Sequence, residues 1–418
     1  MYPVTDGGSE DLAGVPPRPR VRLLRAVADF HRRHGDPVRA EAAARNLVAL
    51  KEELGLRGVD DLVVAARAAL AVGDYRAGAE RAAAALAEAG RDHRAAYRAR
   101  FVLAEAHDRL GGHAEADRVF RHHVPDWLPA PDRDFVVVAE VAALRARGRV
   151  REPLEVVTAL LPTLPRATRH DVRTGAWPAA ALELARLQLL VGAVGKALRT
   201  SAELVAAHRL HGAGEHPVCG VAIGVHAEAL ALGVPRRRAE AVRAVEEVRA
   251  DHARRFGADN PEALDRAVVE GRVLLAAGEP ARAAEVLTAA RARVGAVLGP
   301  DHPLHHRAGH DLARTHLRRW DWPNAVALLE ELRPRQVALL GPRHVDCLLT
   351  GLDLALCHSL AGRRAEARPL YREVSVGLRH EIGRHREPAL RAALARLAAP
   401  LPAPALRVVL RLVLGGAA

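Results

Sequence analysis

The stretch LGPDHPLHHRAGHDLARTHLRRWDWPNAVALLEELRPRQVAL, residues 298–339, contains one complete copy of a pattern that recurs along the chain. Its opening hexamer has counterparts in FGADNP (256–261) and LGPRHV (340–345), and a weaker one in IGRHREP (382–388). The glycines of these copies, Gly257, Gly299, Gly341 and Gly383, are each 42 residues apart. A fixed period of this length predicts an architecture in which similar units stack on one another.

Three further columns keep the same register. They are Gly278, Trp320 and Gly362; Ala283, Ala325 and Ala367; and Leu287, Leu329 and Tyr371. The pattern predicts two helices per unit, with the small alanines where the helices cross and the larger residues in the next layer. Pro303 suits the first turn of a helix that ends near Arg319, because its missing N–H is not needed there. Asp301, or Asp259 one unit earlier, is expected to cap the free N–H groups.

The same two-helix pattern recurs with looser spacing toward the N-terminus. The positions that correspond to the Gly278, Trp320 and Gly362 column, which we call anchors, are 35, 73, 111, 148, 192, 233, 278, 320 and 362. These anchors predict about nine helical hairpins, and hence an all-α, right-handed α-solenoid with a concave groove, because one hairpin alone cannot bury its apolar face.

The expected organisation has four parts. It consists of a disordered tail (1–19), an N-terminal sub-array (20–165), a C-terminal sub-array (178–400, most regular over 256–383) and a cap helix with a short tail (401–418). The break between the sub-arrays is Pro162–Pro178, and PDWLPAPD (125–132) is a lesser break. One continuous solenoid with a longer loop is the alternative.

This pattern resembles the tetratricopeptide repeat (TPR). The C-terminal units are similar to the 42-residue repeats of the kinesin-light-chain type found in many actinobacterial proteins. The resemblance is carried by LGPDHP (298–303), the Leu-Ala pairs at 312–313 and 354–355, and the Gly and Ala columns. It implies a protein-binding scaffold. The family often has Asn before the Leu-Ala pair, where this chain has Val269, Asp311 and Asp353.

The amino-acid composition limits the classes of protein to which the chain can belong. Half of the 418 residues are apolar, which excludes a disordered chain, and aromatic residues make up only 3%, which favours closely packed helices. The net charge of +12 raises nucleic-acid binding as an alternative function, but only Lys51 and Lys196 are lysines. That skew toward Arg is typical of a coding bias, and few aromatics are present to stack on bases.

The sequence indicates a soluble, cytoplasmic protein. The N-terminus has no apolar segment of a signal peptide, and no apolar stretch reaches about 18 residues. Cys219, Cys347 and Cys357 form no C-x-x-C pair, so they are expected to be inert core thiols.

The common catalytic motifs are missing. No phosphate-binding loop is present, none of the four serines lies in a G-x-S-x-G elbow, and His380 to His385 is one residue too long for the zinc motif H-E-x-x-H. We therefore expect no enzyme activity, no cofactor and no metal; an enzyme without a recognisable motif remains an alternative.

One cluster of histidines is a candidate for metal binding. His306 and His310 are four residues apart on one helix, with His302 and His305 close by and Asp311 adjacent. A single metal ion could be reached by both His306 and His310. The alternative is that His302 caps the turn and that the others pack or are solvated.

The better candidate site is the concave face, which the first helix of each hairpin lines. Its predicted partner-binding residues are Asp265, Arg272, Arg307, His310, Asp311, Arg314, Arg318 and Asp353, together with Trp320 and Trp322 in a turn. Arg groups grip carboxylates with two hydrogen bonds, so an acidic peptide or chain terminus is a plausible ligand. A solvated face with internally paired arginines, and tryptophans that only cover their own hairpin, are the alternatives.

The sequence therefore predicts a non-catalytic scaffold that binds a protein or peptide within a regulatory assembly. Nucleic-acid binding is a weaker hypothesis, a membrane partner is not expected, and self-association through the terminal hairpins is a further possibility. This functional prediction rests on the fold and not on a recognised site.

Overall fold

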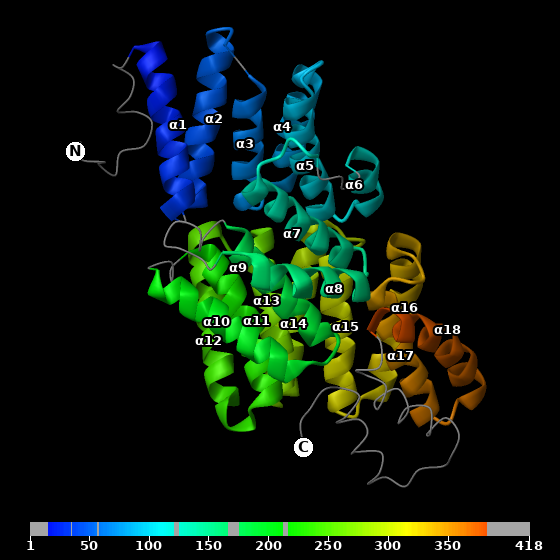
Figure 1. Cartoon of the computed structure of the whole chain (residues 1–418). Coiled ribbons are helices and arrows are strands. Elements are labelled where there is room, and N and C mark those ends of the chain that lie inside the picture. The colour runs from blue at the N-terminus through cyan, green and yellow to red at the C-terminus, as the bar shows by residue number, and fades with distance from the viewer. Residues whose placement is uncertain are drawn as a thin grey trace. The chain divides into compact units, whose positions relative to one another are not determined.

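The computed structural model describes residues 16–34, 36–56, 58–120, 125–165, 175–211 and 216–382. Within these ranges every regular element is a helix and none is a strand, which confirms the predicted all-α class (Figure 1). Helix contacts divide the chain into a first unit, Met1–Arg121, and a second unit, His122–Ala418, and each is described by itself below.

The first unit contains three helix pairs. Its helices are α1 (Pro17–His34), α2 (Pro37–Glu53), α3 (Val59–Ala71), α4 (Tyr75–Ala89), α5 (His93–Arg109) and α6 (His113–Val119).

The second unit contains six helix pairs and two short 3-10 helices. Its α-helices are α7 (Ala130–Ala146), α8 (Arg151–Leu160), α9 (Ala176–Leu190), α10 (Val194–Leu210), α11 (Pro217–Gly233), α12 (Arg238–Phe256), α13 (Pro261–Ala277), α14 (Pro280–Leu298), α15 (Pro303–Arg318), α16 (Trp322–Leu340), α17 (Val345–Leu360) and α18 (Arg364–Ile382). The 3-10 helices are η2 (Leu161–Thr163) and η3 (Pro235–Arg237).

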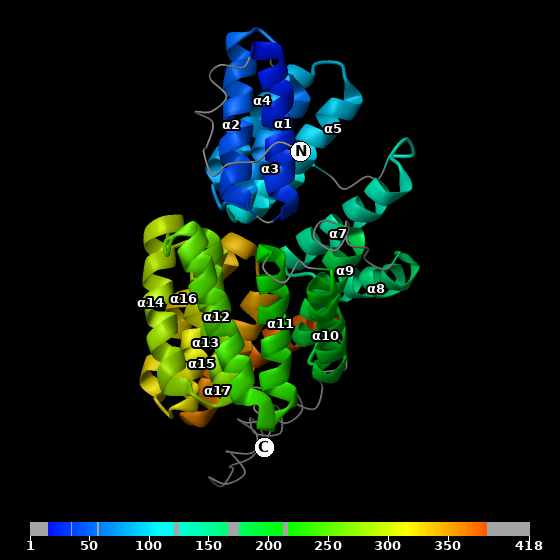
Figure 2. The ribbon, with the colours of Figure 1, turned by 90° about the vertical axis from the view of Figure 1, so that its left-hand side faces the viewer.

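Consecutive helices pack on each other throughout each unit, so the described residues form nine hairpins, as predicted. The odd-numbered helices of the second unit, α7 to α17, also contact one another from one hairpin to the next. They therefore form one layer, and the even-numbered helices form the other. Figure 2 shows the axes of α12, α13 and α14 running roughly parallel to one another. This arrangement is an α-helical solenoid.

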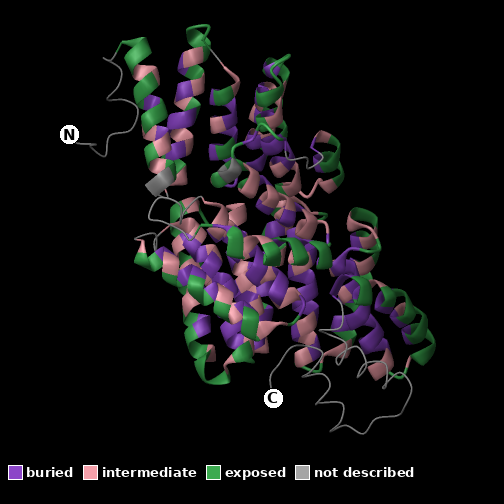
Figure 3. Ribbon diagram, viewed as in Figure 1, coloured by how far each residue is buried: buried purple, intermediate pink, exposed green. Residues whose placement is uncertain are grey.

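The repeated columns are the core of this stack. Ala283, Ala325 and Ala367 are all fully buried, and Leu287, Leu329 and Tyr371 are buried one turn later. Figure 3 shows buried residues on the facing sides of the helices and exposed residues on the outer sides. Both columns are thus part of the buried core, as predicted.

The residue between the two helices of a hairpin, which belongs to the column Gly278, Trp320 and Gly362, adopts a left-handed backbone conformation. Gly278 has a φ of 90° and Gly362 a φ of 79°, and Trp320 keeps the same conformation with a φ of 63°. A positive φ is costly for a residue with a Cβ, so the fold imposes this conformation on Trp320.

The helix caps differ from the prediction by one residue. Asn260 Oδ1 accepts a hydrogen bond from the N–H of Glu262, and His302 Nδ1 accepts one from Leu304. The predicted caps Asp259 and Asp301 lie one position too early, because the residue directly before the proline is the one whose side chain reaches the free N–H groups.

The two ends of the second unit meet. The N–H of Val150, after α7, donates to Glu381 Oε2 in α18 at 3.0 Å. His344, which caps α17, lies 3.0 Å from the carbonyl oxygen of Ala146. One apolar cluster contains Val141 of α7 and residues of α8, α9, α17 and α18. The last hairpin of the second unit therefore packs against the first hairpin of that unit.

The observed division differs from the predicted sub-arrays 20–165 and 178–400. It falls after Arg121, close to the lesser break, while α8 and α9 pack on each other across the predicted joint. Residues 166–174 of that joint lie outside the described residues, as do the expected cap helix and tail at 401–418. Helix α1 begins at Pro17, within the range 1–19 that was expected to be a disordered tail, and residues 1–15 lie outside the described residues.

All three cysteines are buried as free thiols. Burial raises the pKa of Cys219 to about 11 and that of Cys347 to about 12, which agrees with inert core thiols. No helix within the described ranges has the length and hydropathy to span a membrane.

Replacing Ala325 with Leu tests the helix crossing. The fully buried alanine has no room for a larger side chain, so this variant should lose about 1–3 kcal/mol of unfolding free energy. Ala327→Leu on the exposed face of the same helix is the matched control and should change stability by less than about 0.5 kcal/mol. Equal denaturation midpoints for the two variants would contradict the assigned crossing.

Candidate functional site

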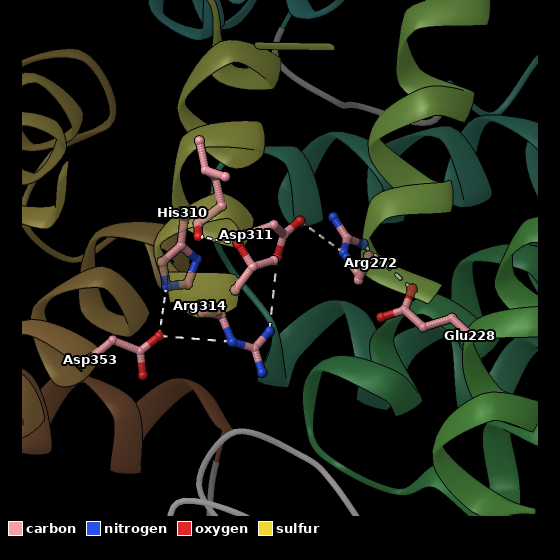
Figure 4. Close-up of polar contacts among 8 residues, drawn as sticks. Glu228, Arg272, His310, Asp311, Arg314 and Asp353 are labelled. Carbon is pink, nitrogen blue, oxygen red and sulfur yellow. Dashed lines mark hydrogen bonds and ion pairs between the residues drawn. The ribbon is translucent and has the colours of Figure 1, made fainter. Parts of the chain in front are cut away.

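The inner helices of the second unit bring two charged columns together. Arg272 and Arg314 occupy one column, 42 residues apart, and Asp311 and Asp353 occupy another. Arg272 Nε donates to Asp311 Oδ2 at 3.1 Å, and Arg314 lies 3.8 Å from Asp311 and 3.9 Å from Asp353 (Figure 4). Asp311 is thus shared by Arg272 and Arg314, and Arg314 also reaches Asp353, so the ion pairs form a continuous ladder across α13, α15 and α17.

Both ends of this ladder are also paired. Arg272 lies 3.5 Å from Glu228 of α11, and His310 Nε2 lies 2.9 Å from Asp353 Oδ2. Asp311, Asp353 and His310 are buried. Because a buried charge without a partner is costly, these contacts hold the inner helices in register.

A second group of buried charges lies on α7 and α9. Glu183 accepts hydrogen bonds from Arg145 Nε at 2.5 Å and from Arg186 Nη1 at 2.7 Å. Burial acts to raise the pKa of Glu183, but the two guanidinium groups outweigh it and lower this pKa to about 2. Glu183 therefore stays ionised at neutral pH.

Asp265 of α13 connects the two groups. It pairs with the neighbouring Arg266, and the charges of Arg307 and Arg186 also act on it. Burial raises the pKa of Asp265, while these arginines more than compensate and lower it to about 2. The charges of α9, α13 and α15 thus form one electrostatic system.

We call this system the inner charged network. Its members are Arg145, Glu183, Arg186, Glu228, Asp265, Arg266, Arg272, Arg307, His310, Asp311, Arg314, Asp346 and Asp353. The six arginines and six carboxylates balance when His310 is neutral. The face predicted to be rich in free arginine is therefore close to neutral.

Two members of the network differ from the others. Within the described ranges, Arg307 of α15 forms no hydrogen bond and no ion pair. The carboxylate of Asp346, at the start of α17, lies 3.9 Å from His344 Nδ1, but that nitrogen already accepts a hydrogen bond from the Asp346 N–H and has no proton to donate. Arg307 and Asp346 are close enough to act on each other electrostatically.

The structure places the sequence-predicted site residues in two locations. Asp265, Arg272, Arg307, His310, Asp311, Arg314 and Asp353 all belong to the inner charged network. Arg318 lies one turn beyond Arg314 and is half-buried. The two tryptophans lie at the turn between α15 and α16, with their rings 5.3 Å apart; Trp320 is 45% exposed, whereas Trp322 packs on the apolar core.

The candidate histidine cluster does not converge on one point. His302 caps α15, His305 Nδ1 contacts the carbonyl oxygen of Arg291 at 3.1 Å, and His310 contacts Asp353. His306 is buried, and burial lowers its pKa to about 4. His302, His305 and His310 thus each serve a separate local role, whereas neither ring nitrogen of His306 has a hydrogen-bond partner among the described residues.

Sequence reasoning missed six members of the network. These are Arg145, Glu183, Arg186, Glu228, Arg266 and Asp346. The matching columns of Arg272 with Arg314 and of Asp311 with Asp353 are visible in the sequence and would have predicted the ladder. The α7 and α9 residues lie in units of irregular spacing, where no column marks them.

These features define an α-helical repeat protein with a buried charged network along its inner helices. No protein-family model matches the chain, and a search of curated proteins gives no match.

Solved structures of repeat proteins are similar to it. A Podosopora anserina kinesin light chain with nearly identical TPR-like repeats is 26% identical, covering 51% of this chain and 98% of its own, with a TM-score of 0.37. A Rap protein complexed with competence and sporulation factor is 11% identical, covering 92% and 99%, with a TM-score of 0.48. A monomeric IFIT1 mutant with Gppp-AAAA is 14% identical, covering 83% and 79%, with a TM-score of 0.41.

The pH dependence of stability tests the buried pairs. Because the pKa of Glu183 lies below its ordinary value of 4.5 in the folded state, its contribution is complete above about pH 4.5 and is lost as the pH falls toward 2. Glu183→Gln leaves Arg145 and Arg186 without their carboxylate and should cost about 3 kcal/mol at pH 7. Melting temperatures from pH 7 to 2.5 should converge for the two proteins at the acid end.

A surface pair supplies the control. Glu155→Gln removes the exposed partner of Arg151 and should change stability by less than about 0.5 kcal/mol at any of these pH values. A Glu183→Gln curve parallel to the wild-type curve over the whole pH range would contradict the low pKa of Glu183.

Proposed function

We propose that the second unit is a non-catalytic scaffold that binds a polypeptide segment at its inner charged network, and that the segment carries charges of both signs. The observation that carries this proposal is the pair Arg307 and Asp346. Within the described ranges Arg307 forms no ion pair and Asp346 pairs only with His344, whereas every other arginine of the network pairs with a carboxylate and every other carboxylate with an arginine.

An incoming ligand would supply the two missing partners. A carboxylate suits Arg307, because a guanidinium group donates two parallel hydrogen bonds to a carboxylate. A Lys or Arg side chain or a terminal ammonium group suits Asp346, whose carboxylate is 25% exposed. A ligand that carries both charges can pair with Arg307 and Asp346 at the same time, and it should therefore bind more tightly than a ligand with one kind of charge.

The charge balance argues against a purely acidic ligand. Six carboxylates line the same face as the six arginines, so a run of acidic residues would meet repulsion as well as attraction. The acidic peptide expected from the sequence becomes, in this proposal, a peptide of mixed charge.

The same charges support binding over catalysis. A general base works best with a pKa near the operating pH, whereas the pKa values of Glu183 and Asp265 are each lowered to about 2. These carboxylates are poor proton acceptors at neutral pH. A regulatory assembly in which the scaffold presents or sequesters a partner is the role that follows.

Peptide pools of defined charge test this proposal. Fluorescein-labelled hexapeptide pools containing fixed Glu, fixed Lys, or both are titrated with the full chain, and fluorescence anisotropy gives the Kd. The mixed pool should bind at least tenfold more tightly than either single-charge pool. Arg307→Ala and Asp346→Asn should each weaken the mixed pool by tenfold or more.

Arg282→Ala is the matched control, since it removes an exposed arginine of α14 that pairs with Glu246 and Glu279 away from the network. Its Kd should equal that of the wild type. Equal binding by the Arg307, Asp346 and Arg282 variants would refute the site, and tightest binding by the Glu pool, or by a single-stranded DNA 20-mer, would favour the other ligand classes.

A further inference from the structure

Three side chains of metal-ligand type converge where the last two hairpins meet. Glu330 comes from α16, His358 from the last turn of α17, and Glu366 from the first turn of α18. One ligand atom from each lies within 4.8 Å of the other two. His358 Nε2 is 3.7 Å from Glu330 Oε1, and Nδ1 is 3.5 Å from Glu366 Oε2.

His358 is the unusual member of this group. Its side chain is only 6% exposed, and Nδ1, which faces Glu366, has no hydrogen-bond partner. A buried polar atom without a partner costs about 1–3 kcal/mol, so such an atom points to a role that the isolated chain does not satisfy.

The preceding repeat shows the ordinary arrangement at this position. His316 lies 42 residues before His358, and its Nδ1 is 2.9 Å from Asp321 Oδ2. The residues 42 positions before Glu330 and Glu366 are Thr288 and Asn324. The histidine of one repeat is therefore paired, and that of the next has two carboxylates arranged around it instead.

This donor set suits a transition-metal cation. An imidazole nitrogen and carboxylate oxygens are ligands of Zn²⁺, and also suit Co²⁺ and Ni²⁺, whereas Mg²⁺ and Ca²⁺ prefer oxygen alone. In a tetrahedral zinc site the ligand atoms lie roughly 3.3 Å apart, given bonds of about 2.0–2.1 Å. Glu330 is 49% exposed and Glu366 53% exposed, so both side chains have room to close the observed gaps.

Arg363 lies beside the same carboxylates. Its Nη1 is 3.4 Å from Glu366 Oε2 and 3.9 Å from Glu330 Oε1. It supplies positive charge where a cation would sit, so it competes with a metal ion. The Arg363 side chain is also partly exposed and has a path to swing into solvent.

We propose that Glu330, His358 and Glu366 form a binding site for a divalent transition-metal cation, of which Zn²⁺ is the best match. The three protein ligands leave a fourth position for water or for a group of a partner protein. The bound ion would join α16, α17 and α18 at this end of the stack. The site shares no residue with the inner charged network, so the result of a metal-binding test does not depend on whether the proposed peptide binding is correct.

Isothermal titration of the full-length chain with Zn²⁺, after removal of metal with EDTA, tests the site. The wild type should show a saturable binding event that His358→Ala weakens by at least tenfold. Arg363→Ala should tighten the same event severalfold, because it removes the competing charge. His316→Ala, the matched control in the preceding repeat, should titrate like the wild type.

A second variant is needed because replacing the buried His358 with Ala can itself destabilise the fold. Glu366→Gln alters an exposed side chain, and thermal melting without metal should match the wild type, while the rise in Tm that Zn²⁺ gives the wild type should disappear. The proposal is overturned if His358→Ala and Glu366→Gln both bind Zn²⁺ with wild-type affinity, or if Arg363→Ala weakens binding.

Discussion

Each hairpin of this protein has an apolar face that only its neighbour covers, and the rest of the structure depends on that constraint. The alanine column at Ala283, Ala325 and Ala367 is fully buried, and the Leu and Tyr column that follows one turn later is buried as well. In the second unit the last hairpin finds a neighbour in the first one, through the apolar cluster and the contact of Glu381 with Val150. The terminal hairpins of this unit are thus covered by one another.

Charges repeat with the same period as the apolar columns. On the inner helices, Arg272 and Arg314 share Asp311, and Arg314 also pairs with Asp353, which forms a ladder. On the outer helices, Arg291 pairs with Glu331 at 2.9 Å, and 42 residues later Arg333 pairs with Glu373 at 2.5 Å. The outer pairs are partly exposed and contribute little to stability, whereas the inner carboxylates are buried and depend on their partners. This difference is why we propose the inner face as the ligand site: a half-buried group that forms no ion pair within the described ranges, such as Arg307, gains most from binding a partner.

The sequence predicted the hairpins well, because burial repeats in one-dimensional columns that a 42-residue register makes visible. Seven of the residues that the sequence assigned to the candidate binding face belong to the inner charged network. The sequence could not show that Arg272 is also paired with Glu228, or that Glu183 pairs with Arg145 and Arg186, because these partners come from other helices and keep no common spacing. The meeting of α18 with α8 was equally hidden, since residues 150 and 381 are brought together by the accumulated curvature of the stack and by no local pattern. Gly309 of α15 lets α16 approach closely, and Gly351 of α17 does the same for α18. These two glycines share the 42-residue register, so the sequence contained a signal for these contacts that the prediction did not use.

Hydrogen exchange after a substitution in α18 tests most directly whether the second unit closes on itself. Leu378 is fully buried in the cluster that spans α7 to α9, α17 and α18, and Leu378→Ala should cost about 2–5 kcal/mol. If the ends meet, amide exchange measured by mass spectrometry will accelerate in α17 and α18 and also in α7 to α9, and it will change less in the intervening α11 and α12. Acceleration that starts at α18 and decays steadily back along the chain, leaving α7 to α9 least affected, would contradict the closed stack.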